Sequence, residues 1–420
     1  MNAHSSKKKV LILGGGFGGI EAARELARRD QKRGTRSIFS ITLVSDKHHF
    51  EYTPALYRVV TGKSPLEVCI PLSDIFEDFK VDISIDTVSE ISLKERTVTG
   101  TSGSRYQYDY LVVALGSQPA YFGISGLDQY ALSFKTISQA LALKRHLHSI
   151  IDEHTHLPKN ETERALHIDV VGAGAAGVEL AGELSGYLKT LAKNHDLDPK
   201  EIKIDIIEAG PRLLPSMPES VSQKAGVRLK ELGIRIMVNT KVLSHDGKII
   251  TYNDGAMPSK TLVWTAGVKP HALYGQTVGW ELAKNGRVIV DEFLRAHGAE
   301  KVFVIGDGAQ TPYSGTAQTA LHDGITVARA IAEYEKFGVP HTPYHPDPSA
   351  YVIPVGPGWG IFSFRGFVFS GRVVWWLREL IELDFFGSIL SFGKAWRAWR
   401  DGQQVCESCA TCEAEIAKTS

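Results

Sequence analysis

A glycine-rich turn between an apolar run and a helical pattern occurs twice in this chain, and no other feature constrains the fold as strongly. The first copy follows the apolar run 9–13, precedes a helical pattern over 20–29, and has Gly14, Gly16 and Gly19 at the positions of G-x-G-x-x-G. One glycine permits the tight turn, one lets the backbone approach a pyrophosphate, and one lets the helix pack on the strand. The pyrophosphate would lie at the helix N-terminus, where free N–H groups favour anions.

The second copy lies near the middle of the chain. It follows the apolar run 165–171, and a long helical pattern over 178–192 comes after it. Its turn has the same three glycines, which are Gly172, Gly174 and Gly177. Two dinucleotide folds in one chain predict two dinucleotides, one that stays bound as FAD and one that exchanges as NADH.

The residue that ends the next strand of each fold should contact a ribose. In the second copy the expected strand 202–207 ends at Glu208, whose carboxylate can accept both ribose hydroxyls of NADH and would repel the 2′-phosphate of NADPH. In the first copy the expected strand 38–44 is followed by a serine, an aspartate and a lysine, which are Ser45, Asp46 and Lys47. The ribose contact there stays ambiguous, because serine occupies the usual acidic position.

Length and charge limit the class of protein. A chain of 420 residues suggests two or three domains. Hydrophobic residues make up 43% and charged residues 22%, a balance that argues against disorder. Lys plus Arg and Asp plus Glu both total 47, so the chain lacks the basic excess of a general nucleic-acid-binding protein.

The few cysteines and the apolar runs give further expectations. Cys69 is expected to be a small core residue, while Cys406, Cys409 and Cys412 form a C-x2-C-x2-C tail without a fourth ligand, so no metal site is predicted. This cysteine usage favours a reducing compartment. No stretch approaches the ~20 apolar residues of a spanning helix. The N-terminus lacks the apolar core of a secretory signal.

Three further segments resemble parts of the flavoproteins that bind two dinucleotides. Segments 108–117 and 262–267 resemble the strands and turns where the chain leaves the two domains, and 302–307 resembles the late FAD-binding strand. The resemblance covers nearly all of residues 8–330. It implies an α/β fold with two Rossmann-like dinucleotide-binding domains, for FAD and NADH, the second inserted in the first.

The same resemblance gives the expected domain boundaries. The FAD-binding domain is expected in two parts, 1–125 and 269–338. The NADH-binding domain is expected at 126–268. A proline-rich linker begins the remaining region, 339–420, which is expected to associate with a membrane surface.

The cysteine positions narrow the resemblance to one branch. Disulfide reductases of this superfamily carry a redox cysteine pair near the flavin, and sulfide:quinone reductases carry cysteines in the second half. None lies between Cys69 and Cys406. The remaining branch, the type II NADH:quinone oxidoreductases, resembles this chain in segments 50–62, 178–184 and 317–322.

This resemblance implies three catalytic residues. Gln318 would donate an amide N–H to a quinone carbonyl. His322 replaces the second glutamine of the A-Q-x-A-x-Q motif; it would lie on the same helical face and deliver protons, unless it is an ordinary polar helix residue. Glu179 would face the nicotinamide–flavin contact and carry a proton, the alternative being a first-turn acid stabilised by the helix dipole.

The binding residues form two groups. The FAD group is Gly14, Gly16, Phe17, Gly18, Gly19, Ser45, Asp46, Lys47, Thr53, Pro54, Ala114, Gly116, Asp307, Ala317 and Gln318. The NADH group is Gly172, Gly174, Gly177, Glu179, Glu208, Ala266 and Gly267.

The segment 371–400 is rich in aromatic residues and has the pattern of a helix that lies in a membrane interface. One helical face would carry Ile389, Phe392, Trp396 and Trp399. Positive charge without a nearby acid would come from Lys394, Arg397 and Arg400, and would attract anionic lipid. A core helix or a homodimer contact is the alternative.

The predicted function is the FAD-dependent oxidation of NADH with two-electron reduction of a membrane quinone, as in respiratory electron transfer. No proton pumping is expected, and the enzyme would lie peripherally on the cytoplasmic face. Two alternatives stay open. One is a soluble NADH-dependent flavin reductase of a protein electron carrier, and the other is a flavin- and NADH-binding redox sensor.

Overall fold

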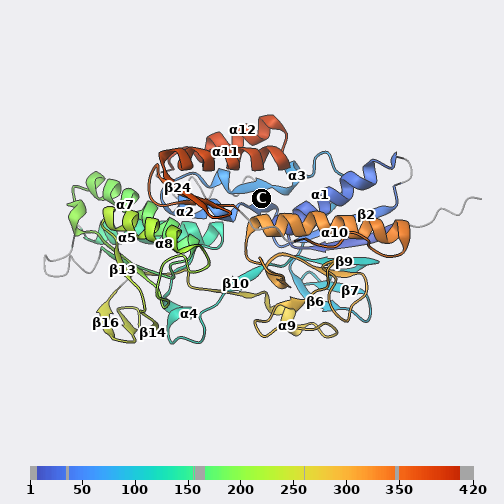
Figure 1. Cartoon of the computed structure of the whole chain (residues 1–420), viewed down its shortest axis with the longest axis horizontal. Coiled ribbons are helices and arrows are strands. Elements are labelled where there is room, and N and C mark those ends of the chain that lie inside the picture. The colour runs from blue at the N-terminus through green and yellow to red at the C-terminus, as the bar shows by residue number, and fades with distance from the viewer. Residues whose placement is uncertain are drawn as a thin grey trace, which may run out of the picture.

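The computed structural model describes residues 7–34, 37–154, 156, 166–259, 261–345 and 350–406. Figure 1 shows two α/β lobes side by side, with the two last helices, α11 (Arg372–Ile389) and α12 (Phe392–Gly402), lying across the top. The chain passes from the first lobe into the second and then returns. The α/β class with two Rossmann-like domains is confirmed.

The first lobe is built on a parallel five-stranded sheet. Its strands, in the order β20-β9-β1-β2-β5, are Val302–Val304, Tyr110–Val113, Lys8–Leu13, Phe39–Ser45 and Asp82–Ile85. The edge strand β20 comes from the chain after the second lobe, so the first sheet is complete only once the chain has returned. This order confirms that the second domain is inserted in the first.

Helices α1 (Phe17–Gln31) and α10 (Ala317–Phe337) lie side by side on this lobe. Their backbones approach closely, because a Cβ on Gly324 would lie 2.7 Å from the carbonyl oxygen of Gly18. The start of α10 is thereby held beside the start of α1. Both helix N-termini belong to segments with expected FAD-binding residues.

The second lobe repeats the arrangement with a parallel sheet in the order β13-β12-β11-β17, which are Arg235–Met237, Lys203–Ile207, His167–Val171 and Thr261–Trp264. One face packs against helices α5 (Ile137–His154), α7 (Ala175–Asn194) and α8 (Glu219–Glu231). The other face packs against an antiparallel sheet of β14 (Val242–His245), β15 (Ile249–Tyr252) and β16 (Gly255–Pro258). Side chains alternate between the two faces, as in any strand buried on both sides.

A two-stranded antiparallel ribbon joins the lobes. It pairs β10 (Ser117–Pro119) with β18 (Val268–Pro270). The amide of Ala120 continues the ribbon by donating to the carbonyl of Gly267 at 3.1 Å. Both passages between the lobes therefore run next to each other.

Shorter elements fill the connections. They are β3 (His49–Glu51), η2 (Thr53–Ala55), α2 (Leu56–Val60), η3 (Pro65–Glu67), β4 (Cys69–Pro71), α3 (Leu72–Ile75), β6 (Val88–Ser92), β7 (Thr97–Gly100), β8 (Arg105–Gln107), α4 (Leu127–Tyr130), η4 (Pro199–Glu201), α9 (Ala272–Gln276), β19 (Val288–Ile289), η5 (Gly306–Gly308) and β21 (Ala309–Gln310). Cys69, on β4, is a buried core residue, as expected.

The C-terminal region is a three-stranded antiparallel sheet followed by the two helices. The strands are β22 (Tyr351–Pro354), β23 (Gly360–Phe364) and β24 (Phe367–Gly371). Within the described residues, no helix combines the length and the apolarity needed to cross a membrane. Cys406 is the last residue described, and Cys409 and Cys412 lie outside the described residues.

The expectation of one continuous helical face over 389–399 is wrong. Leu390 and Ser391 have extended backbones, which end α11 and start α12 in a new direction. Ile389 is consequently buried, whereas Phe392 is 81% exposed. The apolar surface is composed from two helices rather than from one.

The expectation that the positive charges lack nearby acids is also wrong. The ammonium of Lys394 lies 2.9 Å from Asp74 and 2.6 Å from Glu77. The guanidinium of Arg400 lies 2.9 Å from the neighbouring Asp401. The packing of α12 against α3 and the residues after it brings Asp74 and Glu77 to Lys394, whereas Asp401 directly follows Arg400 in the sequence.

Candidate functional site

In the first glycine turn, a side chain would fit at only one of the three motif glycines. Gly14 has φ +104°, and a Cβ there would lie 2.4 Å from the carbonyl oxygen of Ala114. A Cβ on Gly19 would lie 1.9 Å from the carbonyl oxygen of Gly14. A Cβ on Gly16 would meet nothing within 4 Å. Only Gly16 therefore faces free space, at the position where a pyrophosphate approaches.

The second glycine turn has the same geometry. Gly172 also has φ +104°, with a Cβ position 2.5 Å from the Cα of Ala266, and a Cβ on Gly177 would lie 1.9 Å from the carbonyl oxygen of Gly172. Gly174 again faces free space. Neither α1 nor α7 has a side-chain cap at its N-terminus. The uncapped N–H groups and the two open positions fit two pyrophosphates, one for each lobe.

Glu208 is held in place at the end of β12. Its Oε2 accepts a hydrogen bond from the amide of Ala173 at 2.9 Å, and its Oε1 accepts from the amide of Gly210 at 2.7 Å. The carboxylate thus lies against the second glycine turn, where a ribose would follow a bound pyrophosphate. Its remaining lone pairs are available to ribose hydroxyls.

The corresponding end of β2 has no such carboxylate. Ser45 is buried, and its Oγ accepts from the amide of Lys47 at 3.3 Å. Asp46 is exposed, and the ammonium of Lys47 lies 2.7 Å from Glu51. The exposed Asp46 is the carboxylate nearest to the expected ribose position, and the ambiguity in the sequence persists.

Asp307 lies on η5, at the end of β20. Its Oδ2 accepts from Ser117 Oγ at 2.5 Å, which ties the late strand to the first passage between the lobes. Burial lowers the pKa of the nearby Lys135 ammonium, and the Asp307 carboxylate opposes that shift. Lys135 is a polar group near this site that no sequence pattern indicated.

The remaining predicted FAD contacts come from turns around this edge. Ala114 and Gly116 follow β9, and Gly116 has φ +68° with free space around it. Thr53 and Pro54 form η2, in which Thr53 is exposed. Phe17 and Gly18 begin α1, next to the start of α10.

Gln318 and His322 lie one turn apart on α10, so the predicted helical spacing is confirmed. The N-cap Thr316 accepts from the amide of Thr319 at 3.1 Å, which leaves the first-turn amides around Ala317 and Gln318 open. Gln318 is exposed. The half-buried ring of His322 lies against Tyr344, with ring centroids 5.3 Å apart.

Glu179 lies in the first turns of α7. Burial raises the pKa of its carboxyl to about 8, although the Arg378 guanidinium opposes that shift. A carboxyl group with this pKa holds a proton at neutral pH and can give it away. Ala266 and Gly267, the other predicted NADH residues, follow β17, and Ala266 is exposed.

A buried ionic cluster, which no sequence pattern indicated, faces Glu179. Its members are Arg58 on α2, Glu67 on η3, and Arg378, Glu379 and Glu382 on α11, each at most 7% exposed. The Arg58 guanidinium is 2.6 Å from Glu67, 3.0 Å from Glu382 and in contact with Glu379, while Arg378 is 2.6 Å from Glu382. Two guanidinium groups thus face three carboxyl groups, and burial raises the pKa of Glu67 to about 8.

An aromatic cluster connects α11 to the first glycine turn. The ring of Phe385 stacks on Tyr52 at 5.1 Å and lies 5.5 Å from Phe17. Phe17 in turn meets Phe50 edge-on at 4.8 Å. Helix α11 therefore borders the FAD-binding segments through both charged and aromatic side chains.

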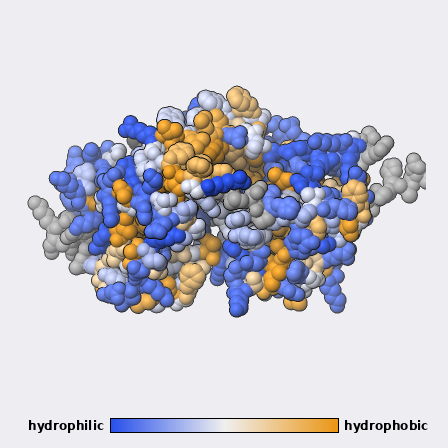
Figure 2. Space-filling model, in the orientation of Figure 1, coloured by the Kyte–Doolittle hydropathy of each residue, from blue (hydrophilic) through white to orange (hydrophobic). Residues whose placement is uncertain are grey.

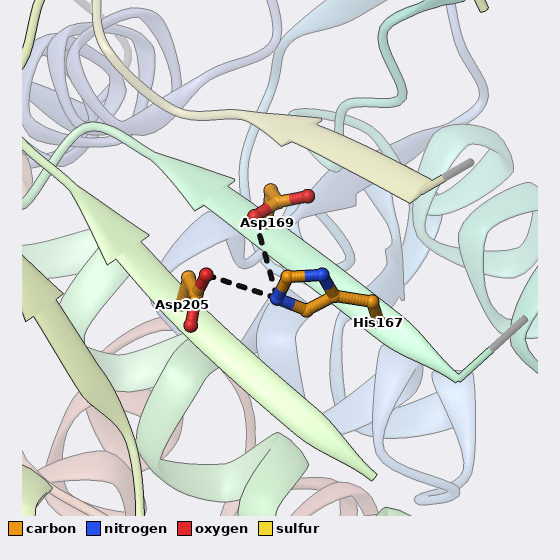
Figure 3. Close-up of side chains that lie close together, drawn as sticks. All are labelled: His167, Asp169 and Asp205. Atoms are coloured by element: carbon orange, nitrogen blue, oxygen red, sulfur yellow. Dashed lines mark hydrogen bonds and ion pairs between the residues drawn. The ribbon is translucent and has the colours of Figure 1, made fainter. Parts of the chain in front are cut away.

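A second charged cluster lies at the opposite end of the second sheet. Figure 3 shows His167 between Asp169 and Asp205, with Nε2 at 2.9 Å from Asp205 and 3.9 Å from Asp169. These three side chains could hold a cation. Arg235 also contacts Asp205, so a protonated His167 and Arg235 already balance the two carboxylates. The three side chains belong to the first three residues of β11 and β12. The glycine turn and Glu208 follow the last residues of these strands, so they lie at the other edge of the sheet.

The paired glycine turns and the inserted second lobe define a class, the flavoprotein oxidoreductases that bind two dinucleotides. The sequence profile of the pyridine nucleotide-disulphide oxidoreductase family matches residues 8–324. The chain is 30% identical over 338 residues to the type II NADH:quinone oxidoreductases of Staphylococcus haemolyticus and Staphylococcus aureus, covering 77% of this chain and 82% of each relative. The chain belongs to the type II NADH:quinone oxidoreductase family.

Solved structures agree on the fold. NDH2 from Plasmodium falciparum, in complex with NADH, superposes with a TM-score of 0.83 at 19% identity, over 94% of this chain and 97% of that chain. The sulfide:quinone oxidoreductase of Aquifex aeolicus gives a TM-score of 0.75 at 19% identity, over 96% of this chain and 98% of that chain. The family assignment confirms an oxidoreductase that uses FAD and NADH.

Proposed function

We propose that this chain oxidises NADH in its second lobe and reduces a quinone beside the first, while α11 and α12 lie on a membrane surface. The observation that carries the proposal is the repeated glycine turn, with free space at Gly16 in one lobe and at Gly174 in the other. Bound FAD would supply the redox chemistry, by accepting a hydride from NADH and passing two electrons on to the quinone. The protein residues bind, orient and supply protons.

Named residues have distinct tasks in this proposal. Glu208 fixes the ribose of NADH and disfavours a 2′-phosphate. The amide of Gln318 donates to a quinone carbonyl. Glu179 holds a proton on its carboxyl group at neutral pH and supplies it as the quinone is reduced. His322 stays a second proton donor in the proposal, although its ring lies against Tyr344.

The membrane surface is proposed because α11 buries three charged side chains while several of its apolar side chains are exposed. Arg378, Glu379 and Glu382 face inward. The apolar side chains of this region that face outward are Phe367, Phe369, Val373, Trp376, Leu380, Ile381, Phe392, Trp396 and Val405. Figure 2 shows a hydrophobic area at the top of the molecule, where Figure 1 places α11 and α12. Exposed apolar area on this scale favours a bilayer or another protein.

A lipid-soluble quinone would reach the enzyme from the bilayer, so a membrane surface at α11 would serve substrate entry. The aromatic cluster of Phe385, Tyr52 and Phe17 lies between α11 and the first glycine turn. A quinone that leaves the bilayer at α11 would therefore meet apolar side chains on its way inward. The cytoplasmic face is proposed because NADH is supplied there. A homodimer contact is the competing use of the same surface.

The experiment is anaerobic flavin spectroscopy on the purified chain. Flavin absorbance should bleach with NADH and return when a quinone is added. Absence of flavin absorbance after supply of FAD would refute the proposal. Recovery of the flavin absorbance with a protein electron carrier but not with quinone would favour the soluble reductase. Binding of NADH without turnover would favour the redox sensor.

A further inference from the structure

A partly open cavity of about 760 Å³ lies between α2, α7 and the residues that follow α12. Its apolar walls include Leu191, Pro357 and Trp375. Its polar groups include Arg58, Lys63, His148 and His195. Among the described residues that line it, Glu183 is the only carboxylate.

Glu183 connects this cavity with Glu179. The two glutamates are four residues apart on α7, so their side chains lie on the same face, with Cβ atoms roughly 5–6 Å apart. Burial raises the pKa of both carboxyl groups, and repulsion from Glu183 raises the pKa of Glu179 further. Glu183 is only half-buried. A carboxyl group with one side in a cavity and the other toward a second acid is placed to pass protons between them.

Burial raises the pKa of both glutamates, and the cations nearby oppose that shift. The groups that face them are Arg58 on α2, Lys63 after it, the buried Tyr57 hydroxyl, and Arg378, Glu379 and Glu382 on α11. The two arginines are already engaged by three carboxyl groups of the ionic cluster. The Lys63 ammonium donates to the carbonyl of Gln403 at 2.8 Å. The cations near Glu179 and Glu183 are therefore shared with other groups, and they only partly offset the effect of burial on the two pKa values.

We propose that Glu183 is a proton-relay residue, which takes protons from water in the 760 Å³ cavity and passes them to Glu179. The inference rests on the proposed role of Glu179. Reduction of a quinone takes up two electrons and two protons, whereas NADH brings one hydride, so one proton per turnover comes from water. The Glu183 carboxyl gives its proton to the Glu179 carboxylate, directly or through one water, and a proton from the cavity then restores Glu183.

The test separates the two half-reactions of the full-length, FAD-loaded enzyme in stopped flow. In Glu183→Gln, bleaching of the flavin by NADH should keep its rate. The recovery of the flavin absorbance after addition of a water-soluble quinone should slow by at least about tenfold. This recovery should also show an increased solvent isotope effect. Glu183→Asp should retain an intermediate rate. Thr190→Val, on the same helix and cavity wall, should behave as wild type.

A small weak acid gives a readout that structural damage would not produce. Formate or imidazole fits the cavity and should restore the quinone step in Glu183→Gln in proportion to its concentration, but should not do so in Glu179→Gln. A wild-type quinone step in Glu183→Gln, or a slow step that added acid leaves slow, would overturn the relay. If Glu179→Gln itself reduces quinone normally, the proposed role of Glu179 has failed instead.

Discussion

The guanidinium of Arg378 on α11 donates a hydrogen bond to the carbonyl oxygen of Pro54, 3.1 Å away. Pro54 belongs to η2, a segment expected to contact FAD, while α11 carries exposed apolar side chains on its other face. One helix therefore joins the proposed membrane surface to the proposed flavin site. Arg378 also pairs with Glu382 at 2.6 Å.

Replacement of Arg378 by methionine should destabilise the protein by about 3 kcal/mol, because the buried Glu382 carboxylate loses one of its two guanidinium partners. Flavin should also be retained less well, since Pro54 loses its donor. Thermal denaturation and the ratio of flavin to protein absorbance measure the two effects. Arg372→Met, at an exposed position on the same helix, should change stability by no more than about 0.5 kcal/mol. Equal effects of both substitutions would contradict the conclusion that Arg378 stabilises the fold and the segment around Pro54.

Gly174→Ala should raise the KM for NADH by about tenfold or more while FAD stays bound. The backbone of Gly174 has φ −69°, which alanine adopts easily, and a Cβ there meets no protein atom. The new methyl group would occupy the space proposed for the pyrophosphate. Steady-state kinetics give the KM, and flavin absorbance confirms the fold. An unchanged KM would place the NADH pyrophosphate elsewhere.

Glu208→Ser should reduce the preference for NADH over NADPH by about tenfold or more in kcat/KM, because the carboxylate that repels a 2′-phosphate is lost. The matched control is Glu219→Ser, which removes an exposed acid from α8 in the same lobe. Steady-state kinetics with NADH and with NADPH give the ratio of the two kcat/KM values for each variant. Unaltered selectivity in Glu208→Ser would reject the ribose assignment.

Substitution of exposed apolar side chains alone should weaken membrane binding and leave the fold intact. Trp376, Leu380, Phe392 and Trp396 are each at least 45% exposed, so their joint replacement by serine should leave the flavin content intact. Co-sedimentation with anionic vesicles should fall at least about tenfold, since each buried apolar side chain contributes roughly 1.5–3 kcal/mol. Val227→Ser and Val278→Ser remove exposed valines elsewhere and should not affect sedimentation. Unchanged vesicle binding with a halved mass in light scattering would identify a dimer surface instead.

His167→Gln should lower the melting temperature most below about pH 6.5, and the difference should shrink as the pH rises. Its hydrogen bond to Asp205 raises the pKa of His167, so its charge stabilises the fold fully below the unfolded pKa. That contribution is lost as the pH rises through the folded pKa. Burial raises the pKa of Asp169 to about 6, so this carboxylate is charged and in need of a cation above that pH. A difference that does not vary between pH 6 and pH 9 would argue against a charged His167.

Local patterns were sufficient for the parts of the fold that local backbone geometry controls. The two glycine turns, the strand that ends at Glu208 and the helical spacing of Gln318 and His322 were all read from a few neighbouring residues. Such features are determined within one strand–turn–helix unit, where glycine positions and apolar periodicity leave few alternatives. The family resemblance then followed from the order of these units.

What the amino-acid order could not reveal is decided by packing between distant segments. Nothing near Arg58 indicates that it meets Glu379 and Glu382, more than 300 residues later, or that α11 buries these charges while it exposes apolar side chains such as Trp376. The break at Leu390 and the acids beside Lys394 likewise depend on where α12 comes to lie. The sequence by itself determined two nucleotide-binding units, because each is a local motif. Only the tertiary structure decided which charges are buried together and which cavity Glu183 reaches, because burial and Coulomb interactions depend on distance in space rather than along the chain.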